Sequence, residues 1–209
     1  MIRVPLPGGG VAELREPTPV DLEVHGWGND GDIALACIRT IDGEPVKPDD
    51  VTAQEQQAAL VAVQSFIRPS LAQAEFMEAN WREATRRSAW LALPSGMTYD
   101  AEGKVADCTL WLEIGHPKVS EMNDAMERVS GRSERERVKS YQQALHRLAL
   151  RCFRSVREGD KTRTLTMNDV SPWRWTAMDL SVALYAFATV CQLTDGQKAA
   201  VAAGVEVVA

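Results

Sequence analysis

The sequence is poor in the residues and motifs that mark enzymes and metal sites. It has 3 histidines and 4 cysteines among 209 residues, and none of them has the spacing of a zinc site. The GxSxG, GxxxxGK(S/T) and HExxH motifs of hydrolases, nucleotide-binding proteins and metalloproteases are also missing. We therefore expect no catalytic, cofactor-binding or metal-binding residues, and a protein that is not an enzyme.

The cysteines lie at positions 37, 108, 152 and 191 and form no CxxC pair. Their apolar surroundings predict buried, reduced thiols in a cytosolic protein. The first ten residues, MIRVPLPGGG, lack the apolar run of a secretory signal, which agrees with that expectation. Cys37 and Cys152 are candidate nucleophiles and His146 a candidate base, but the sequence places no partner to activate them, so we interpret all three as structural.

The longest apolar stretch is too short to cross a membrane. Residues 176–193 are mostly apolar, but Asp179 interrupts them, and the uncharged remainder falls about one-third short of the roughly 20 residues that a membrane span needs. The stretch instead predicts a helix that is buried on most sides, and a protein without a membrane partner.

Charge is distributed unevenly along the chain. The net charge of −6 argues against a general nucleic-acid binder. Residues 128–163 nevertheless contain eleven Lys or Arg and four acids, so this segment carries +7 and the remainder −13. The asymmetry indicates either a surface that meets a partner or a solvated helical face.

Local patterns predict a helical protein with a hairpin at its start. Apolar and polar side chains alternate on both sides of PGGG within residues 2–14, which predicts a β-hairpin. Thr18 is placed to cap the helix that follows. Further helices are expected over 33–41, over 52–67 from a Thr-x-x-Glu capping box, and over 69–87.

The second half of the chain is predicted to repeat this order of elements over more residues. Side chains in residues 108–114 alternate between an apolar and a more polar face, which predicts a strand. A capping box at Ser133 and Glu136 predicts a long helix to about residue 156. The apolar helix begins near Ser171, and Thr194 is placed to cap a last short helix.

Two segments resemble each other closely enough to suggest duplication. LACIRTIDG at 35–43 is similar to LRCFRSVREG at 150–159, and Leu-Pro-x-Gly occurs at both 6–9 and 93–96. Chance similarity between two amphipathic helices remains the alternative. We predict an α+β, predominantly helical fold of two tandem related units, each a β-hairpin followed by two or three helices. The units would span 1–68 and 89–209, with a helical connector over 69–88.

The repeated LxCxR segment is expected to be a core-facing helix in each unit. In the second unit Arg147, Arg151 and Arg154 then lie on the side opposite the buried cysteine, at i, i+4 and i+7. They would form either the solvated edge of the helix or a partner contact.

Aromatic residues give the other candidate contact sites. Trp173, Arg174 and Trp175 fall in the first turn of the apolar helix, where two tryptophans cannot both face one core. Trp and Arg are enriched in interface hot spots, although a hydrophobic staple is the alternative. Trp81 is expected either on an exposed docking edge of the connector helix or in the ordinary core.

The chain also resembles small assembly proteins of tailed bacteriophages. The resemblance rests on an opening strand with LPxGG, then ELREPTxxDL, and on LPSGMTY at 93–99. It covers residues 1–25 and 90–125, and it is similar in style to tail assembly chaperones and to baseplate hub assembly proteins. This chain is longer than the short chaperones and looks doubled, so the choice between a chaperone and a structural component stays open.

The resemblance implies a protein that binds other phage tail or baseplate proteins, with homo-oligomerisation as a further option. It would act in the cytoplasm of the bacterial host or be retained in the virion tail. The family offers no catalytic residues to carry over. The alternative hypothesis is a helical nucleic-acid-associated protein that uses the basic segment 128–163.

Overall fold

The computed structural model describes residues 1–85, 87–166, 168–170 and 175–191. The helices are α1 (Pro19–His25), α2 (Asp30–Cys37), α3 (Ala53–Ile67), α4 (Leu71–Ala79), α5 (Val119–Met126), α6 (Glu134–Cys152) and α7 (Ala177–Val190), with 3-10 turns at Pro48–Asp50 and Pro94–Gly96. The strands are β1 (Ile2–Pro5), β2 (Val11–Leu14), β3 (Ile38–Ile41), β4 (Glu44–Pro45), β5 (Arg82–Thr85), β6 (Ser88–Ala92), β7 (Met97–Tyr99), β8 (Val105–Cys108), β9 (Leu110–Gly115), β10 (Phe153–Glu158) and β11 (Lys161–Thr164).

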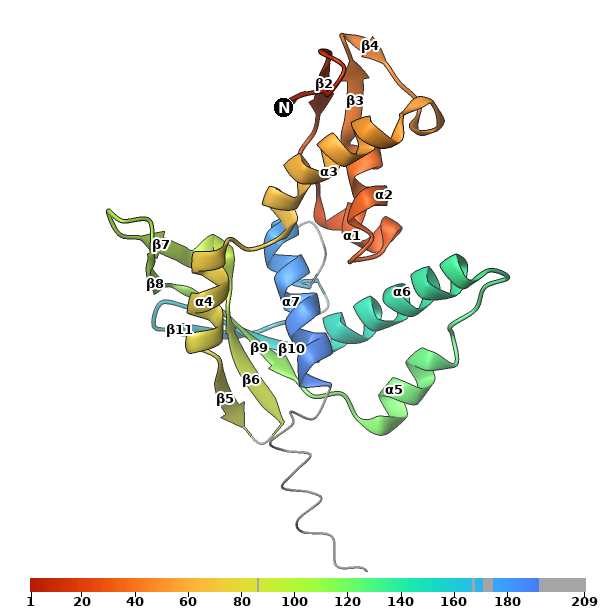
Figure 1. Ribbon diagram of the computed structural model, residues 1–209. Coiled ribbons are helices and arrows are strands. Elements are labelled where there is room, and N and C mark those ends of the chain that lie inside the picture. The colour runs from red at the N-terminus through yellow and green to blue at the C-terminus, as the bar shows by residue number, and fades with distance from the viewer. Residues whose placement is uncertain (86, 167, 171–174, 192–209) are drawn as a thin grey trace, which may run out of the picture.

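The strands form three antiparallel sheets (Figure 1). The first has the order β1-β2-β3-β4, and the second is a curled sheet of order β11-β10-β9-β6-β5. Strands β7 and β8 form a separate hairpin between β6 and β9. Helix α7 lies between the first sheet with its helices and the five-stranded sheet (Figure 1).

The predicted fold class is wrong. The described residues are 46% helical and 25% strand, which defines a mixed α/β fold and not a predominantly helical one. The predicted unit, a finished hairpin followed by helices, is also wrong. Helices α1 and α2 are inserted between β2 and β3, and α5 and α6 between β9 and β10, so each helix pair interrupts a sheet.

The repeated segment spans a helix-to-strand junction, which explains the error. Helix α2 ends at Cys37 and β3 starts at the next residue; α6 ends at Cys152 and β10 starts at the next. Helical periodicity runs through these short apolar segments and cannot mark where a strand begins. The helices predicted to end near residues 41 and 156 therefore end about four residues earlier.

The arginine of each repeated segment is the extra residue of a β-bulge. Ile38 and Thr40 pair with consecutive residues of β2, which leaves Arg39 unpaired, and Arg154 is left over in the same way between β10 and β9. Both arginines are exposed, while Cys37 and Cys152 are buried. The LxCxR pattern thus encodes a buried helix end followed by a bulge, and Arg154 lies on a strand rather than on the helix of Arg147.

The helix starts were predicted more accurately than the ends. The capping boxes of Thr52 with Glu55 and of Ser133 with Glu136 are both formed, so these predictions are confirmed. The helix predicted over 69–87 ends at Ala79, and residues 82–85 form β5 at the edge of the second sheet. The predicted short helix from Thr194 lies outside the described residues.

Helix α7 supplies the centre of the core. Leu180, Ala183, Leu184 and Phe187 are fully buried and belong to one cluster with side chains from both large sheets, such as Leu14 and Leu112. The prediction of a helix buried on most sides is confirmed. Helix α7 packs on β6 and β9 of the five-stranded sheet and on α1 and α3, which belong to the part of the chain that carries the four-stranded sheet. Its burial therefore joins the two parts of the chain into one apolar core.

The second Leu-Pro-x-Gly motif fixes the start of α7. The backbone N–H of Ser95 donates a hydrogen bond to Asp179 Oδ1 at 3.0 Å, and Thr176 Oγ1 donates to Asp179 Oδ2 at 2.7 Å. A Cβ at Gly96 would lie 2.5 Å from the backbone nitrogen of Leu110, so the close approach of this turn to β9 requires glycine.

The Arg-Glu-Pro-Thr motif forms a second polar anchor at the start of α1. Arg15 donates two hydrogen bonds to the carboxylate of Asp21, at 2.7 and 2.6 Å, and the N–H and hydroxyl of Thr18 donate to the same group. Burial by itself raises the pKa of Asp21, but the hydrogen bonds from Arg15 and Thr18 outweigh it and leave that pKa lowered. The motif therefore has a structural role in this fold.

We expect Asp21→Asn to destabilise the protein by about 3 kcal/mol, because it leaves the partly buried Arg15 without its counter-charge. Urea unfolding followed by circular dichroism measures the change. The control is Glu13→Gln, which removes the exposed ion pair with Arg3 and should cost about 0.5 kcal/mol. Equal effects of the two substitutions would contradict the assignment of Asp21 as an anchor.

Candidate functional site

A hollow with a mostly apolar lining lies beside α7. It encloses about 710 Å³ and is bounded by α7, by α4 and by the connection between α3 and α4. We call it the α7 groove. Its lining residues are Ile67, Arg68, Pro69, Met77, Glu78, Trp81, Leu91, Val182, Tyr185, Ala186 and Thr189.

One face of α7 forms the wall of this groove. Val182, Tyr185, Ala186 and Thr189 lie at i, i+3, i+4 and i+7, so they share a side of the helix. The core takes the opposite side, which includes Leu184. Because α7 is apolar on nearly all sides, the face that the core does not cover remains apolar and open.

Aromatic side chains are held firmly at this groove. Tyr185 is 42% exposed, and its ring packs edge-on against Trp27 with the ring centroids 5.1 Å apart. At the rim, Arg68 forms an ion pair of 2.6 Å with the buried carboxylate of Asp30. Preorganised aromatic side chains lose little conformational entropy on binding, so they suit an interface.

Trp81 lies beyond the end of α4 and not on the predicted connector helix, and its role as a docking residue stays a prediction. It is partly buried and packs against the main core, and it also lines the α7 groove near Met77. Sequence reasoning missed Tyr185 and Met77 as groove residues. The i, i+3, i+4, i+7 spacing from Val182 was visible in the sequence, but only the packing shows which face of α7 stays uncovered.

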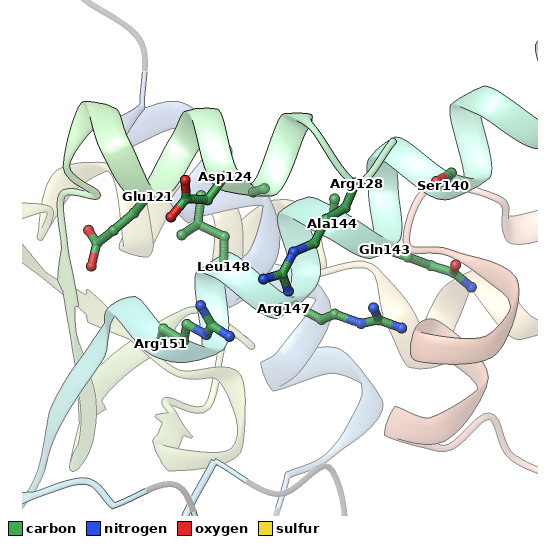
Figure 2. Close-up of a pocket in the computed structure, with 10 residues that line it drawn as sticks. Glu121, Asp124, Arg128, Ser140, Gln143, Ala144, Arg147, Leu148 and Arg151 are labelled. Carbon is green, nitrogen blue, oxygen red and sulfur yellow. The ribbon is translucent and has the colours of Figure 1, made fainter. Parts of the chain in front are cut away.

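A second hollow lies between α5 and α6, and two of the predicted arginines line it (Figure 2). Arg147 and Arg151 are one turn apart on α6, and Arg128 joins them from the end of α5, although the sequence gave no reason to single it out. We call this hollow of about 60 Å³ the arginine crevice. Its apolar part is formed by Ala144 and Leu148, which are buried.

Arg154 does not join the other two predicted arginines. It follows the end of α6, at the bulge of β10, and its guanidinium covers Gly115 so closely that a Cβ there would clash with it. The predicted set of three arginines on one helical face is therefore reduced to Arg147 and Arg151.

The tryptophans near the start of α7 are only partly described. Trp175 is half-buried and packs against Phe153 with ring centroids 5.8 Å apart, and its buried indole nitrogen has no hydrogen-bond partner among the described residues. It lines a separate hollow of about 420 Å³ with residues of the loop before α1. Trp173 and Arg174 lie outside the described residues.

A further set of aromatic and basic side chains crosses the five-stranded sheet. The guanidinium carbon of Arg157 lies 5.2 Å from the ring centroids of both Trp90 and Trp111, and that of Arg82 lies 5.9 Å from the ring of Trp111. These cation–π contacts link β5, β6, β9 and β10 on one face of the sheet. Trp111 is buried, so we assign these contacts to stabilisation of the sheet.

The titratable side chains singled out in the sequence are kept uncharged by burial. Burial raises the pKa of the Cys37 thiol to about 11 and that of Cys152 to about 12, so both are protonated at neutral pH. Cys108 and Cys191 are also free thiols with a raised pKa. Within the described ranges, no group of three His, Cys, Asp or Glu side chains is placed to hold a metal ion.

His146 is 2% exposed, and neither of its ring nitrogens has a hydrogen-bond partner in the part of the chain that the structure describes. Burial, with a smaller contribution from the charge of Arg147, lowers its pKa to about 4. The imidazole is therefore neutral and structural at physiological pH, in agreement with its interpretation as a core residue.

None of the helices in the described part of the chain is long and apolar enough to cross a membrane. No family model, curated protein or solved structure matches this chain.

We expect the pKa of His146 to make the protein less stable in acid. Because its pKa falls from about 6.5 in the unfolded chain to about 4 in the fold, the unfolded chain binds the extra proton between these values. The contribution of neutral His146 to the free energy of unfolding should be fully present above pH 6.5. It should fall by about 3 kcal/mol as the pH drops to 4. Urea unfolding across this range measures it.

The control for this effect is a pair of variants. His146→Leu should remove most of the loss between pH 6.5 and 4, whereas His116→Gln, at an exposed position, should retain it. An unchanged pH profile in His146→Leu would show that other groups cause the acid sensitivity.

Proposed function

We propose that this protein is a non-enzymatic assembly or structural protein of a bacteriophage tail or baseplate, and that it acts by binding other tail proteins. The α7 groove is the observation that carries the proposal. It combines an apolar wall on a central helix with two rigid aromatic side chains, Trp81 and Tyr185, and the sequence resembles tail assembly proteins in its LPxG and REPT segments.

The chemistry of the groove specifies the kind of segment that it binds. Its wall offers Val182, Ala186 and Leu91, with Arg68 and Glu78 at the rim. An apolar face of a partner helix would bury its side chains there, at about 1.5–3 kcal/mol for each large one. We infer that the occupant is an apolar helical segment of a tail component that is not yet assembled.

The proposed site of action is the host cytoplasm, where tail components are made. A chaperone would release its client and be missing from finished particles, whereas a baseplate component would remain in them. Mass spectrometry of purified particles decides between the two roles.

A nucleic-acid function has less support. The arginines of the basic segment meet at the arginine crevice, but Glu121 and Asp124 line the same crevice and would repel a phosphate backbone. The basic segment therefore carries a mixed surface rather than a continuous positive one.

The test of the proposed function is co-purification with tail proteins from cells producing the phage that encodes this chain. Tyr185→Asp should reduce recovery of tail proteins at least about tenfold, because it places a charge on the apolar wall. The matched control is Tyr141→Asp on α6, since Tyr141 is 45% exposed, nearly as much as Tyr185, and lies outside the groove.

Thermal unfolding of both variants shows that each remains folded. Recovery of no tail protein by the unmodified chain would refute the proposed function. Equal recovery with the two tyrosine variants would instead refute the groove as the binding surface.

A further inference from the structure

The arginine crevice carries a net positive charge, because three arginines and two carboxylates, Glu121 and Asp124, line it. Arg128, Arg147 and Arg151 are exposed and line one hollow, and within the described residues none of them forms an ion pair with a carboxylate. Figure 2 shows the three side chains reaching the space between α5 and α6 from both sides. Like charges held this close repel one another, and a bound anion would relieve that repulsion.

The helices hold two of these arginines in place. Arg147 and Arg151 share one face of α6 at i and i+4, and α5 packs along the same helix. Their aliphatic stems lie beside Leu148, which is buried in the main core. Arg147 and Arg151 are therefore carried by a packed helix pair, whereas Arg128 lies in the turn that follows α5.

The size and lining of the crevice select the ligand. About 60 Å³ accommodates a group such as a carboxylate and is too small for a nucleobase. Guanidinium groups bind carboxylates through paired, parallel hydrogen bonds. Glu121 and Asp124 lie at the same end of the crevice as Arg151, whereas Arg128 and Arg147 lie further along it (Figure 2). One end is therefore mixed in charge and the other is positive.

We propose that the arginine crevice binds side-chain carboxylates of an acidic helical segment in a partner tail protein. A peptide matches both ends of the crevice, because its carboxylates can meet the arginines while an amide or basic side chain meets Glu121. A nucleic acid carries only negative charge along its backbone and would be repelled at that end. The inference rests on the proposed function for the identity of the partner, and it adds a second surface on α5 and α6.

The test uses the full chain and a fluorescein-labelled synthetic helix in which glutamate alternates with leucine and alanine. Fluorescence anisotropy should show binding at about 50 mM salt that weakens towards about 200 mM, because salt screens the attraction between the arginines and the carboxylates of the peptide. A matched peptide with glutamine in place of glutamate should bind at least roughly tenfold more weakly.

Matched variants locate the site. Arg147→Gln with Arg151→Gln should weaken binding of the glutamate peptide at least roughly tenfold. Arg132→Gln with Arg137→Gln changes the net charge equally on the same helical hairpin, but neither residue lines the crevice, and binding should stay within about twofold. All four arginines are exposed, and circular dichroism verifies that both variants are folded.

Three results would overturn the proposal: no binding of the glutamate peptide, equal weakening by the two double variants, or stronger binding of a labelled DNA duplex than of the peptide. Each is independent of the co-purification test. If tail proteins are still recovered through the α7 groove while the peptide fails to bind, the crevice proposal alone is refuted. If the peptide binds and no tail protein is recovered, the carboxylate site stands and the phage assignment falls.

Discussion

Burial of α7 is the constraint on which the rest of the structure depends. Leu180, Leu184 and Phe187 are inaccessible to solvent. Helix α7 packs on β6 and β9 of the five-stranded sheet and on helices α1 and α3, and α3 in turn packs on β1 and β2 of the four-stranded sheet. The elements packed on α7 do not cover its whole circumference, and the face from Val182 to Thr189 forms the wall of the α7 groove.

Polar anchors determine how the loops approach this core. Asp21 receives hydrogen bonds from Arg15 and Thr18, and Asp179 receives them from Thr176 and Ser95. Each carboxylate is buried, so it must be satisfied. Asp21 ties the segment just before α1 to the start of that helix, and Asp179 ties the distant turn of Ser95 to the start of α7. The motifs that suggested a phage assembly protein are built from these anchors, which means that they report on folding rather than on a binding site.

The two candidate surfaces differ in the physical basis of binding. The α7 groove offers apolar area and rigid aromatics, which favour affinity. The arginine crevice offers fixed charges of both signs, which favour orientation and specificity. They are built on different helices, so a partner segment at one surface leaves the other accessible, and a variant in one can be studied without altering the other.

The sequence by itself determined the capping boxes that start α3 and α6, the apolar character of α7 and the burial of Cys37 and Cys152, because capping and hydrophobicity are local properties. The start of α7 was predicted near Ser171, but the helix begins at Ala177. The sequence could not determine where helices give way to β3 and β10, since strands form only when a distant partner supplies their hydrogen bonds. The sequence predicted Arg154 beside Arg147 and did not predict Arg128 there. Neither the start of β10 nor the packing of α5 on α6 is a local property. Only the tertiary structure decided which arginines meet and which face of α7 stays open, because both depend on what packs against each helix.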